Sequence, residues 1–220
     1  MDDDERRRQR FERGTDPARV LALSDGVIAI IITLLVLEIH VPELTGGQDL
    51  REALREVRPS FVAFLISFVV VAIAWAGHRD QFALIRRTDR TLAWLNILYL
   101  LPLSVLPFAT SLLARYDEEP VALRMYGICM VAIAVTRLIM WIYATGRPYL
   151  LFVPIDARSR WTGLALVAAQ GVIYAVAIAI AAASPTASLW IYAAVPVLYF
   201  VVITIARTTA PPGSAEQDFT

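Results

Sequence analysis

Long apolar segments alternate with short polar ones along this chain. A bilayer core of about 30 Å takes about 20 helical residues to cross. Six segments are mainly apolar and about that long. They occupy residues 19–41, 59–77, 92–114, 121–145, 161–183 and 189–206. Their apolar residues are continuous rather than alternating, which favours helices over the strands of a barrel. The pattern therefore predicts an all-α integral membrane protein with six transmembrane helices.

The polar segments predict how the chain is organised around these spans. Residues 1–16 are charged, and residues 208–220 are rich in Pro, Gly and Ser. We expect both to be mobile cytoplasmic tails on a six-helix domain of residues 17–207. Residues 42–58 contain the stretch QDLREALREVRP, whose Leu50, Leu54 and Val57 recur at helical spacing and predict a short helix outside the membrane. Residues 184–188 predict a tight hairpin.

Composition supports the membrane assignment. Hydrophobic residues make up 58% of the 220 positions and charged residues 18%, and the mean hydropathy is +0.60. An ordinary soluble domain is about 45–50% apolar. The same apolar excess excludes a disordered chain. Cys129 is the one cysteine, so no intrachain disulfide is possible.

The charges balance in number but not in position. The chain has 20 basic residues, all of them arginine, and 20 acidic ones, which leaves no polybasic footprint for nucleic acid. Fourteen arginines lie in residues 1–19, 79–90 and 147–160 and at position 207, on one side of the spans. Arg51, Arg55, Arg58, Arg115 and Arg124 lie on the other side. The positive-inside rule then predicts a multi-pass protein of the cell membrane with both termini in the cytoplasm.

Residues suited to catalysis are few. The two histidines, His40 and His78, are expected near opposite membrane faces, and the chain has no HExxH, CxxC or glycine-rich phosphate loop. We therefore expect no enzyme activity and no cofactor. A metal site would need ligands from several chains, and no feature indicates a soluble protein partner.

Ser24, Asp25 and Gly26 interrupt the otherwise apolar first span. An ionisable residue inside a membrane is costly unless it is paired or hydrated, so Asp25 marks a candidate functional position. Two purely structural roles are also open to Asp25. It could lie near enough to the interface to be hydrated, or it could pair with an arginine only to hold helices together.

Helical geometry separates Asp25 from an aliphatic stripe on the same span. At about 100° per residue, Ile30, Leu34 and Leu37 fall within about 60° of one another, and Thr33 lies at the edge of this stripe. Asp25 lies about 140° from Ile30. If the stripe faced a central axis, Asp25 would face neighbouring helices and act as a structural clamp. From periodicity alone, lipid contact or core packing explains the stripe better than a pore lining does.

Polar residues also mark the second and third spans. Trp75 and His78 are three residues apart and share a helix face. His78 either donates a hydrogen bond to Asp25 or is solvated. Asn96 is a polar residue early in the third span, and Arg137 lies inside the fourth, where it needs a partner or a wet cavity. The sequence does not identify the partner of Arg137.

The first three spans resemble the transmembrane protein 175 family of potassium channels. The family signature is an arginine, three residues and then FSDGVFAI. Here Arg19 precedes LSDGVIAI at residues 23–30, with Leu and Ile in place of the two phenylalanines. Trp75 with His78, and the pattern LNxLxLLxLSxLPFATxLL at residues 95–113, also resemble the family.

The resemblance implies a homotetramer in membrane lipid, with the first helix of each subunit lining a central pore. Its narrowest point would be a ring of Ile30 side chains, with Leu34 and Leu37 further outward and Thr33 as the polar neighbour. Permeant potassium would pass along the axis at Ile30, Thr33 and Leu34. The resemblance further implies a hydrogen-bond network beside the pore helix, formed by Arg19, Ser24, Asp25, Trp75 and His78.

The expected function is a potassium-selective channel with a hydrophobic constriction. The chain has no TVGYG-like segment for a carbonyl filter, so we expect modest selectivity. Glu38 and Glu43 near the outer mouth either concentrate cations or are simply hydrated. The alternative function is a proton- or ion-coupled secondary transporter that uses Asp25, His78 and Arg137 as a relay. A non-conducting membrane scaffold is a third hypothesis.

Overall fold

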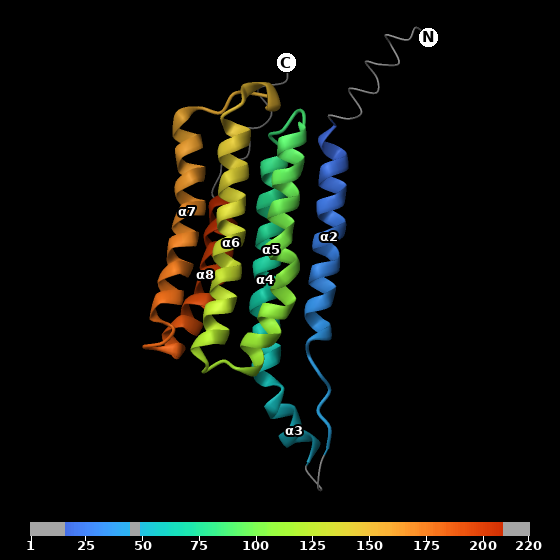
Figure 1. Cartoon of the computed structure of the whole chain (residues 1–220), viewed down its shortest axis with the longest axis vertical. Helices are drawn as coiled ribbons and strands as arrows, with labels where there is room; N and C mark the ends of the chain where they lie inside the picture. Colours follow the sequence, from blue (N-terminus) through green and yellow to red (C-terminus); the bar gives the residue numbers. More distant parts are fainter. Residues whose placement is uncertain (1–15, 45–48, 209–220) are drawn as a thin grey trace, which may run out of the picture.

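Long antiparallel helices form a bundle in the computed structural model (Figure 1). The structure describes residues 16–44 and 49–208, with side chains described to residue 199. The long helices are α2 (Pro17–Leu37), α4 (Arg58–Phe82), α5 (Arg90–Arg115), α6 (Pro120–Thr145), α7 (Ala157–Ile180) and α8 (Pro185–Thr208). Two short elements are α3 (Leu50–Glu56) and the 3-10 helix η1 (Pro148–Leu150). No strand occurs within these ranges, and the all-α prediction is confirmed.

The predicted spans correspond to these helices, with shifted ends. Five of them, α2, α4, α5, α6 and α7, are long and apolar enough to cross a membrane. The sixth predicted span falls within α8, a helix of 24 residues. The first span was expected to reach residue 41, but α2 ends at Leu37, where Glu38 caps the helix. The predicted tails, residues 1–16 and 208–220, lie almost wholly outside the described residues.

Capping residues explain where several helices begin. The carboxylate of Asp16 accepts a hydrogen bond from the Ala18 backbone N–H at 2.9 Å, just before Pro17 opens α2. Asp89 and Asp156 serve α5 and α7 in the same way, accepting from backbone N–H groups at 2.7 and 2.8 Å. Such caps satisfy N–H groups that have no partner inside the helix. The helix starts are therefore encoded locally.

The last hairpin lies earlier than expected. The link between α7 and α8 consists of residues 181–184, not 184–188. Pro185 begins α8, and the hydroxyl of Ser184 accepts a hydrogen bond from the Ala187 N–H at 3.4 Å. Ser188, which was expected in the loop, is buried and donates to the Ala177 carbonyl. A proline at the first helical position favours a helix start. The Ser-Pro pair therefore begins α8 even though the polar residues of this segment are typical of a loop.

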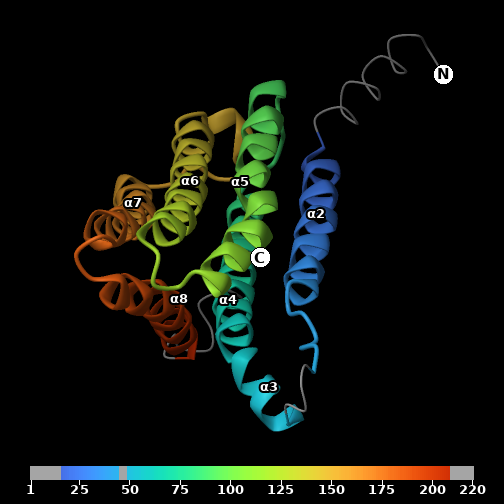
Figure 2. The ribbon, with the colours of Figure 1, turned by 60° about the horizontal axis from the view of Figure 1, so that its bottom comes forward.

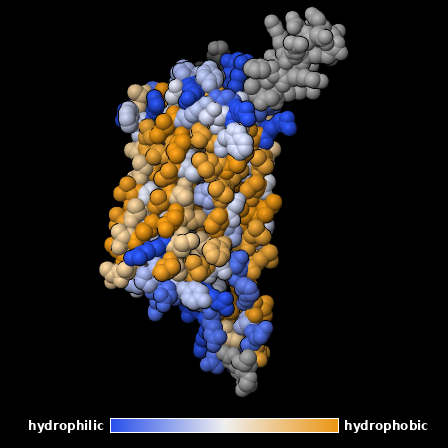
Figure 3. Space-filling model, viewed as in Figure 1, coloured by the Kyte–Doolittle hydropathy of each residue, from blue (hydrophilic) through white to orange (hydrophobic). Residues whose placement is uncertain are grey.

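The helices are not equally covered by their neighbours. α2 lies at one edge of the bundle and packs against α4 and α5 (Figures 1 and 2). α6 lies between α5 and α7, and α8 packs against α7, α4 and α6. Figure 3 shows a broad hydrophobic band around the middle of the molecule, with hydrophilic residues at both ends. This distribution is that of a multi-pass membrane protein.

Two loops are joined at the end of the bundle where α2 begins. Asp89 accepts hydrogen bonds from the hydroxyls of Tyr143 and Tyr149, each at 2.8 Å. The guanidinium of Arg147 stacks on the Tyr143 ring at 3.6 Å. Partial burial alone would raise the pKa of Asp89, but these hydrogen bonds, the Leu92 N–H and the Arg147 charge hold its pKa below the ordinary value. The carboxylate thus ties the α4–α5 loop to the end of α6.

Candidate functional site

The helix α2 has one buried face and one wide exposed face. Ser24, Ile28, Ile31 and Leu35 are buried, each with no more than 2% of its surface exposed. These residues face α4 and α5, the two helices that pack against α2. The opposite face includes Ile30, of which 59% is exposed, although the next residue in sequence is fully packed. The subunit alone therefore leaves a long apolar surface uncovered.

All the residues predicted to line a pore lie on this exposed face. Ile30, Leu34 and Leu37 are exposed large aliphatic side chains. Thr33 is exposed beside them, and its hydroxyl donates to the Ile30 carbonyl at 2.8 Å. That bond uses the hydroxyl proton, so the oxygen still presents lone pairs to the exposed side. Gly26 lies on the same face, and a Cβ added there would meet no described atom within 4 Å beyond its chain neighbours and the nearby backbone of α2.

A buried polar group attaches the other face of α2 to the bundle. The amide oxygen of Asn96 lies 2.7 Å from Nε2 of His78. The amide nitrogen of Asn96 donates to Oγ of Ser24 at 2.9 Å. Ser24 also lies within hydrogen-bond distance of the Val20 carbonyl, at 3.0 Å. Ser24, His78 and Asn96 are all fully buried. Asn96 of α5 therefore links the first two long helices.

Aromatic rings fix the position of His78. Its imidazole stacks on Phe82 with ring centroids 4.4 Å apart and on Tyr99 at 5.5 Å. The hydroxyl of Tyr99 donates to the Ala74 carbonyl at 3.1 Å, which fixes this ring in turn. Within the described residues, Nδ1 of His78 has no hydrogen-bond partner. The histidine is thus a packed core residue held through one nitrogen.

A second contact with α2 lies on the exposed side. The indole N–H of Trp75 donates to the carboxylate of Asp25 at 2.9 Å. The guanidinium of Arg79 lies 5.3 Å from the centre of the Trp75 ring, and it also pairs with Asp80 at 3.4 Å. This contact joins α2 to α4 without any participation of Asn96. It is less buried than the first contact, so each bond in it is worth less.

The structure separates the residues of the predicted network into two groups. Ser24 and His78 belong to the buried group, and Asp25 and Trp75 to the exposed one. Arg19 is exposed, and in the described part of the chain it forms a bond with neither group. His78 meets Asn96, so neither of the two roles considered for it, a bond to Asp25 or solvation, is observed.

Sequence reasoning noted Asn96 but gave it no role. The amide side chain of Asn96 could have indicated a role, because an amide in an apolar span needs partners for two donors and an acceptor. Such partners would lie on neighbouring helices. Arg79 was counted among the arginines at the cytoplasmic side but was given no contact with Trp75. Its spacing of four residues from Trp75 on one helix would have placed the two side chains together.

The remaining candidates lie away from both groups. Glu38 and Glu43 follow the end of α2, where Glu38 is half-buried and Glu43 exposed. Arg137 of α6 packs closely against Gly77 of α4. A Cβ added at Gly77 would clash with the Arg137 guanidinium, so the close approach depends on the glycine. In the described ranges, no three His, Cys, Asp or Glu side chains gather to bind a metal ion.

Comparison with known proteins identifies the family. The family model described as "Endosomal/lysosomal potassium channel TMEM175" matches residues 19–107. A protein of Streptomyces collinus named a potassium channel is 39% identical over 146 residues, which are 64% of this chain and 71% of that protein. The chain belongs to the TMEM175 family. The matched region contains α2, α4 and most of α5, and so includes both anchoring groups and the exposed stripe.

Structural similarity extends the TMEM175 match beyond that region. A crystal structure from Chamaesiphon minutus, titled a lysosomal potassium-selective channel TMEM175 homolog, aligns with a TM-score of 0.75 and 32% identity. The alignment covers 88% of this chain and 98% of that one. The human protein named "Endosomal/lysosomal proton channel TMEM175" is 30% identical over 134 residues, which are 60% of this chain but 27% of the human protein.

These names are those of ion channels rather than of enzymes, which confirms the expectation that this chain is not an enzyme. They also confirm the resemblance to the TMEM175 family stated from the sequence. The protein is therefore a multi-pass membrane protein of an ion-channel family.

Proposed function

We propose that this chain is the subunit of a homotetrameric potassium channel in the cell membrane, with α2 of each subunit lining the pore. The observation that carries the proposal is the exposed apolar face of α2, a helix that lies at the edge of the bundle (Figure 2). One subunit has a single copy of this helix and cannot surround an ion path. Several copies arranged about an axis would enclose one.

The narrowest point of this pore is a ring of Ile30 side chains, with Leu34 and Leu37 beyond it. Apolar rings of this kind gate by excluding water. Because Ile30 points away from the rest of its own subunit, tilting or rotating α2 would change the width of the ring without opening the hydrophobic core.

Selectivity for potassium over sodium is modest in this proposal. An apolar neck favours the ion with the lower dehydration cost, and potassium is the larger and more easily dehydrated of the two. Thr33 supplies one oxygen per subunit near the neck, which compensates only in part for lost water. Glu38 and Glu43 at the far end of α2 raise the local concentration of cations.

The two anchoring groups set the balance between open and closed pores. They hold α2 through Asn96 and through Trp75, on faces that do not line the pore. Arg19, at the start of the helix, adds a contact with a neighbouring subunit or a lipid headgroup. In the same proposal six helices, including α8, cross the membrane, and both termini are cytoplasmic.

Single-channel recording of the purified protein in planar bilayers tests this function. We expect unitary potassium currents, and we expect Ile30→Asn to increase them because an amide hydrates the neck. Val36→Asn is the matched control, since Val36 is also exposed but lies about 120° from Ile30 around the helix. Equal currents in the wild type and in Ile30→Asn would contradict the proposed neck.

The same recordings discriminate the other hypotheses. Slow, saturable, coupled flux without unitary current would indicate a secondary transporter, and silence would indicate a scaffold. The transporter is not favoured, because its proposed relay residues use separate partners. Asp25 binds Trp75, His78 binds Asn96, and Arg137 packs on Gly77. The mass of the detergent-solubilised assembly tests the tetramer independently.

A further inference from the structure

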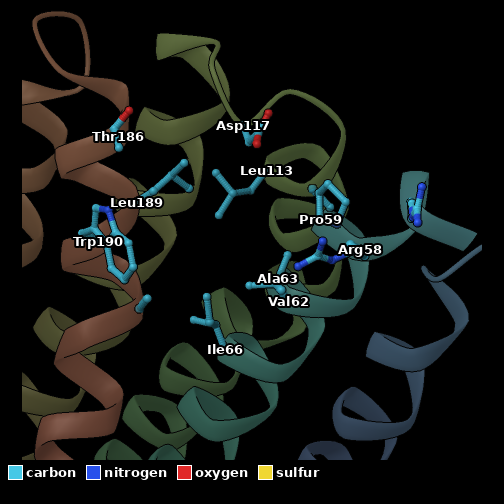
Figure 4. Close-up of a pocket in the computed structure, with 13 residues that line it drawn as sticks. Arg58, Pro59, Val62, Ala63, Ile66, Leu113, Asp117, Thr186, Leu189 and Trp190 are labelled. Carbon is cyan, nitrogen blue, oxygen red and sulfur yellow. The ribbon is translucent and has the colours of Figure 1, made fainter.

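A cavity lies apart from the exposed face of α2, between α4, α5 and α8. Its volume is about 560 Å³, within the range of roughly 300–1,000 Å³ found for small-ligand sites. Figure 4 shows Leu189 and Trp190 of α8 on one wall, facing Val62 and Ile66 of α4 on the other. Neither anchoring group of α2 contributes to this cavity, so the proposed conduction path does not account for it.

The mouth of the cavity is charged. Arg55 of α3 and Arg58, the first residue of α4, line it together with Asp117, which follows the end of α5. These are the ionisable residues of the lining, so its formal charge is +1. All three stand at helix ends, which is the level of lipid headgroups in a membrane-spanning bundle.

The body of the cavity is apolar and extends into the bundle. Ile66 is eight residues beyond Arg58 on α4, a distance of about 12 Å along a helix. Ala193 is eight residues beyond Pro185 on α8 and reaches the same depth. Both lie within one leaflet of a bilayer whose core is about 30 Å thick. The cavity therefore combines a cationic mouth with a groove of acyl-chain depth.

We propose that this cavity binds an anionic phospholipid of the leaflet at the end of the bundle opposite the start of α2. Its phosphate lies between Arg55 and Arg58, whose planar guanidinium groups match phosphate oxygens. One acyl chain lies along Val62, Ile66 and Leu189. The carboxylate of Asp117 accepts a hydrogen bond from a hydroxyl of the headgroup, and its negative charge disfavours a second phosphate.

Other classes of ligand fit the cavity less well. A small soluble anion would leave the apolar groove, about 12 Å deep, unfilled. A plain hydrocarbon would leave the net +1 charge of the mouth without a counter-charge. A lipid with one net negative charge matches both the +1 mouth and the apolar body. The proposal does not depend on the protein conducting ions.

Quenching of Trp190 fluorescence by brominated lipids tests the proposal. The protein is placed in nanodiscs of phosphatidylcholine that contain increasing fractions of acyl-brominated phosphatidylglycerol, phosphatidylethanolamine or phosphatidylcholine. Subtracting the signal of Trp190→Phe isolates this residue. We expect half-maximal quenching at an about fivefold lower fraction of phosphatidylglycerol than of phosphatidylcholine, the preference that one net arginine charge provides near a membrane surface.

Two variants and one control locate the site. Arg55→Gln/Arg58→Gln should bring phosphatidylglycerol to the level of phosphatidylcholine. The control, Arg51→Gln/Arg115→Gln, changes two arginines at the same end but outside the cavity and should not. Ala193→Phe keeps both arginines and narrows the groove, so it should reduce the preference as well. Circular dichroism of each variant checks that the helices are retained.

Several outcomes would overturn the proposal. Equal quenching by the three lipids indicates ordinary annular lipid, and a preference for phosphatidylethanolamine indicates a zwitterionic ligand. No quenching by any lipid means that a second copy or another segment covers the cavity. A preference that survives the double arginine substitution places the lipid elsewhere.

Discussion

The two faces of α2 carry the same kinds of residue and have different surroundings. Ile31 is 2% exposed, whereas the adjacent Ile30 is 59% exposed. Ile28 and Leu35 are packed like Ile31, while Leu34 and Leu37 are open like Ile30. An aliphatic side chain in a membrane helix therefore does not show by itself whether it contacts protein, lipid or a pore.

Polar residues distinguish the faces better than apolar ones. Ser24 on the buried face bonds with Asn96 of another helix, whereas Thr33 on the exposed face bonds, among the described residues, only with Ile30 of its own helix. A hydroxyl can satisfy its donor locally in a helix, so its presence alone does not require a partner. The bonds between helices therefore mark the fixed face of α2.

The largest effect is expected from breaking the buried anchor with Asn96→Leu. This change leaves His78 buried with no hydrogen bond to either ring nitrogen, at a cost of roughly 1–3 kcal/mol. Ser24 loses its bond to α5 but keeps the one to the Val20 carbonyl, so its share of the cost is smaller. We expect a large drop in the unfolding midpoint in mixed detergent and SDS micelles. Ser104→Ala is the control, because Ser104 of the same helix bonds within the described part of the chain only with the Leu100 carbonyl. An equal effect of the two substitutions would show that Asn96 does not anchor α2.

The next largest effect is a difference in stability between alanine substitutions at the adjacent Ile30 and Ile31. Ile31→Ala removes fully buried methyl groups and should lower stability by roughly 2–5 kcal/mol. Ile30→Ala should cost less than about 1 kcal/mol, because most of that side chain is already exposed within the subunit, and it should increase unitary current. The same micelle assay and bilayer recordings measure both quantities. If Ile30→Ala destabilised the protein as much as Ile31→Ala, then Ile30 would be packed in the assembly.

A smaller effect is expected at the exposed anchor. Trp75→Phe removes the indole donor to Asp25 and keeps an aromatic ring, so it should cost about 1 kcal/mol. We expect a change in open probability with unchanged ion preference, and the same from Asp25→Asn. Trp94→Phe, another exposed tryptophan, serves as the control. A change in the ratio of potassium to sodium permeability would instead place Asp25 in the ion path.

The smallest change in stability is expected for Gly26→Ala. Within the subunit the added methyl group meets no atom, and alanine favours a helix by about 1 kcal/mol over glycine. The variant should therefore fold at least as well as the wild type. If this face lines the pore, four methyl groups at the level of Gly26 should reduce the current. An unaltered current in a more stable protein would indicate that Gly26 faces lipid.

Local patterns were enough to predict the helices and the approximate position of the site. Hydropathy placed all the long helices to within a few residues, because the bilayer fixes both their length and their apolar character. The interruption at Ser24 and Asp25 located the part of α2 that is fixed to α4 and α5. The position of the last hairpin was wrong, because the polar residues 184–188 include the first turn of α8.

The connections between helices could not be predicted in the same way. His78 was expected to bond with Asp25 or with solvent, but it bonds with Asn96. Residues 18 positions apart, such as these two, meet only when two helices pack at a particular rotation and register. Many small packing terms determine that register, and no single residue reports it.

The sequence alone determined a helical membrane protein, the direction of its charge bias and the residues of α2 that share a face. These properties follow from solvent and from helix periodicity, which act locally. Only the tertiary structure decided which face of α2 is buried, that Asn96 connects it to His78, and that a charged cavity opens beside α8. Each of these depends on which helices are neighbours, because a buried polar group is satisfied only by the partner that packing brings to it.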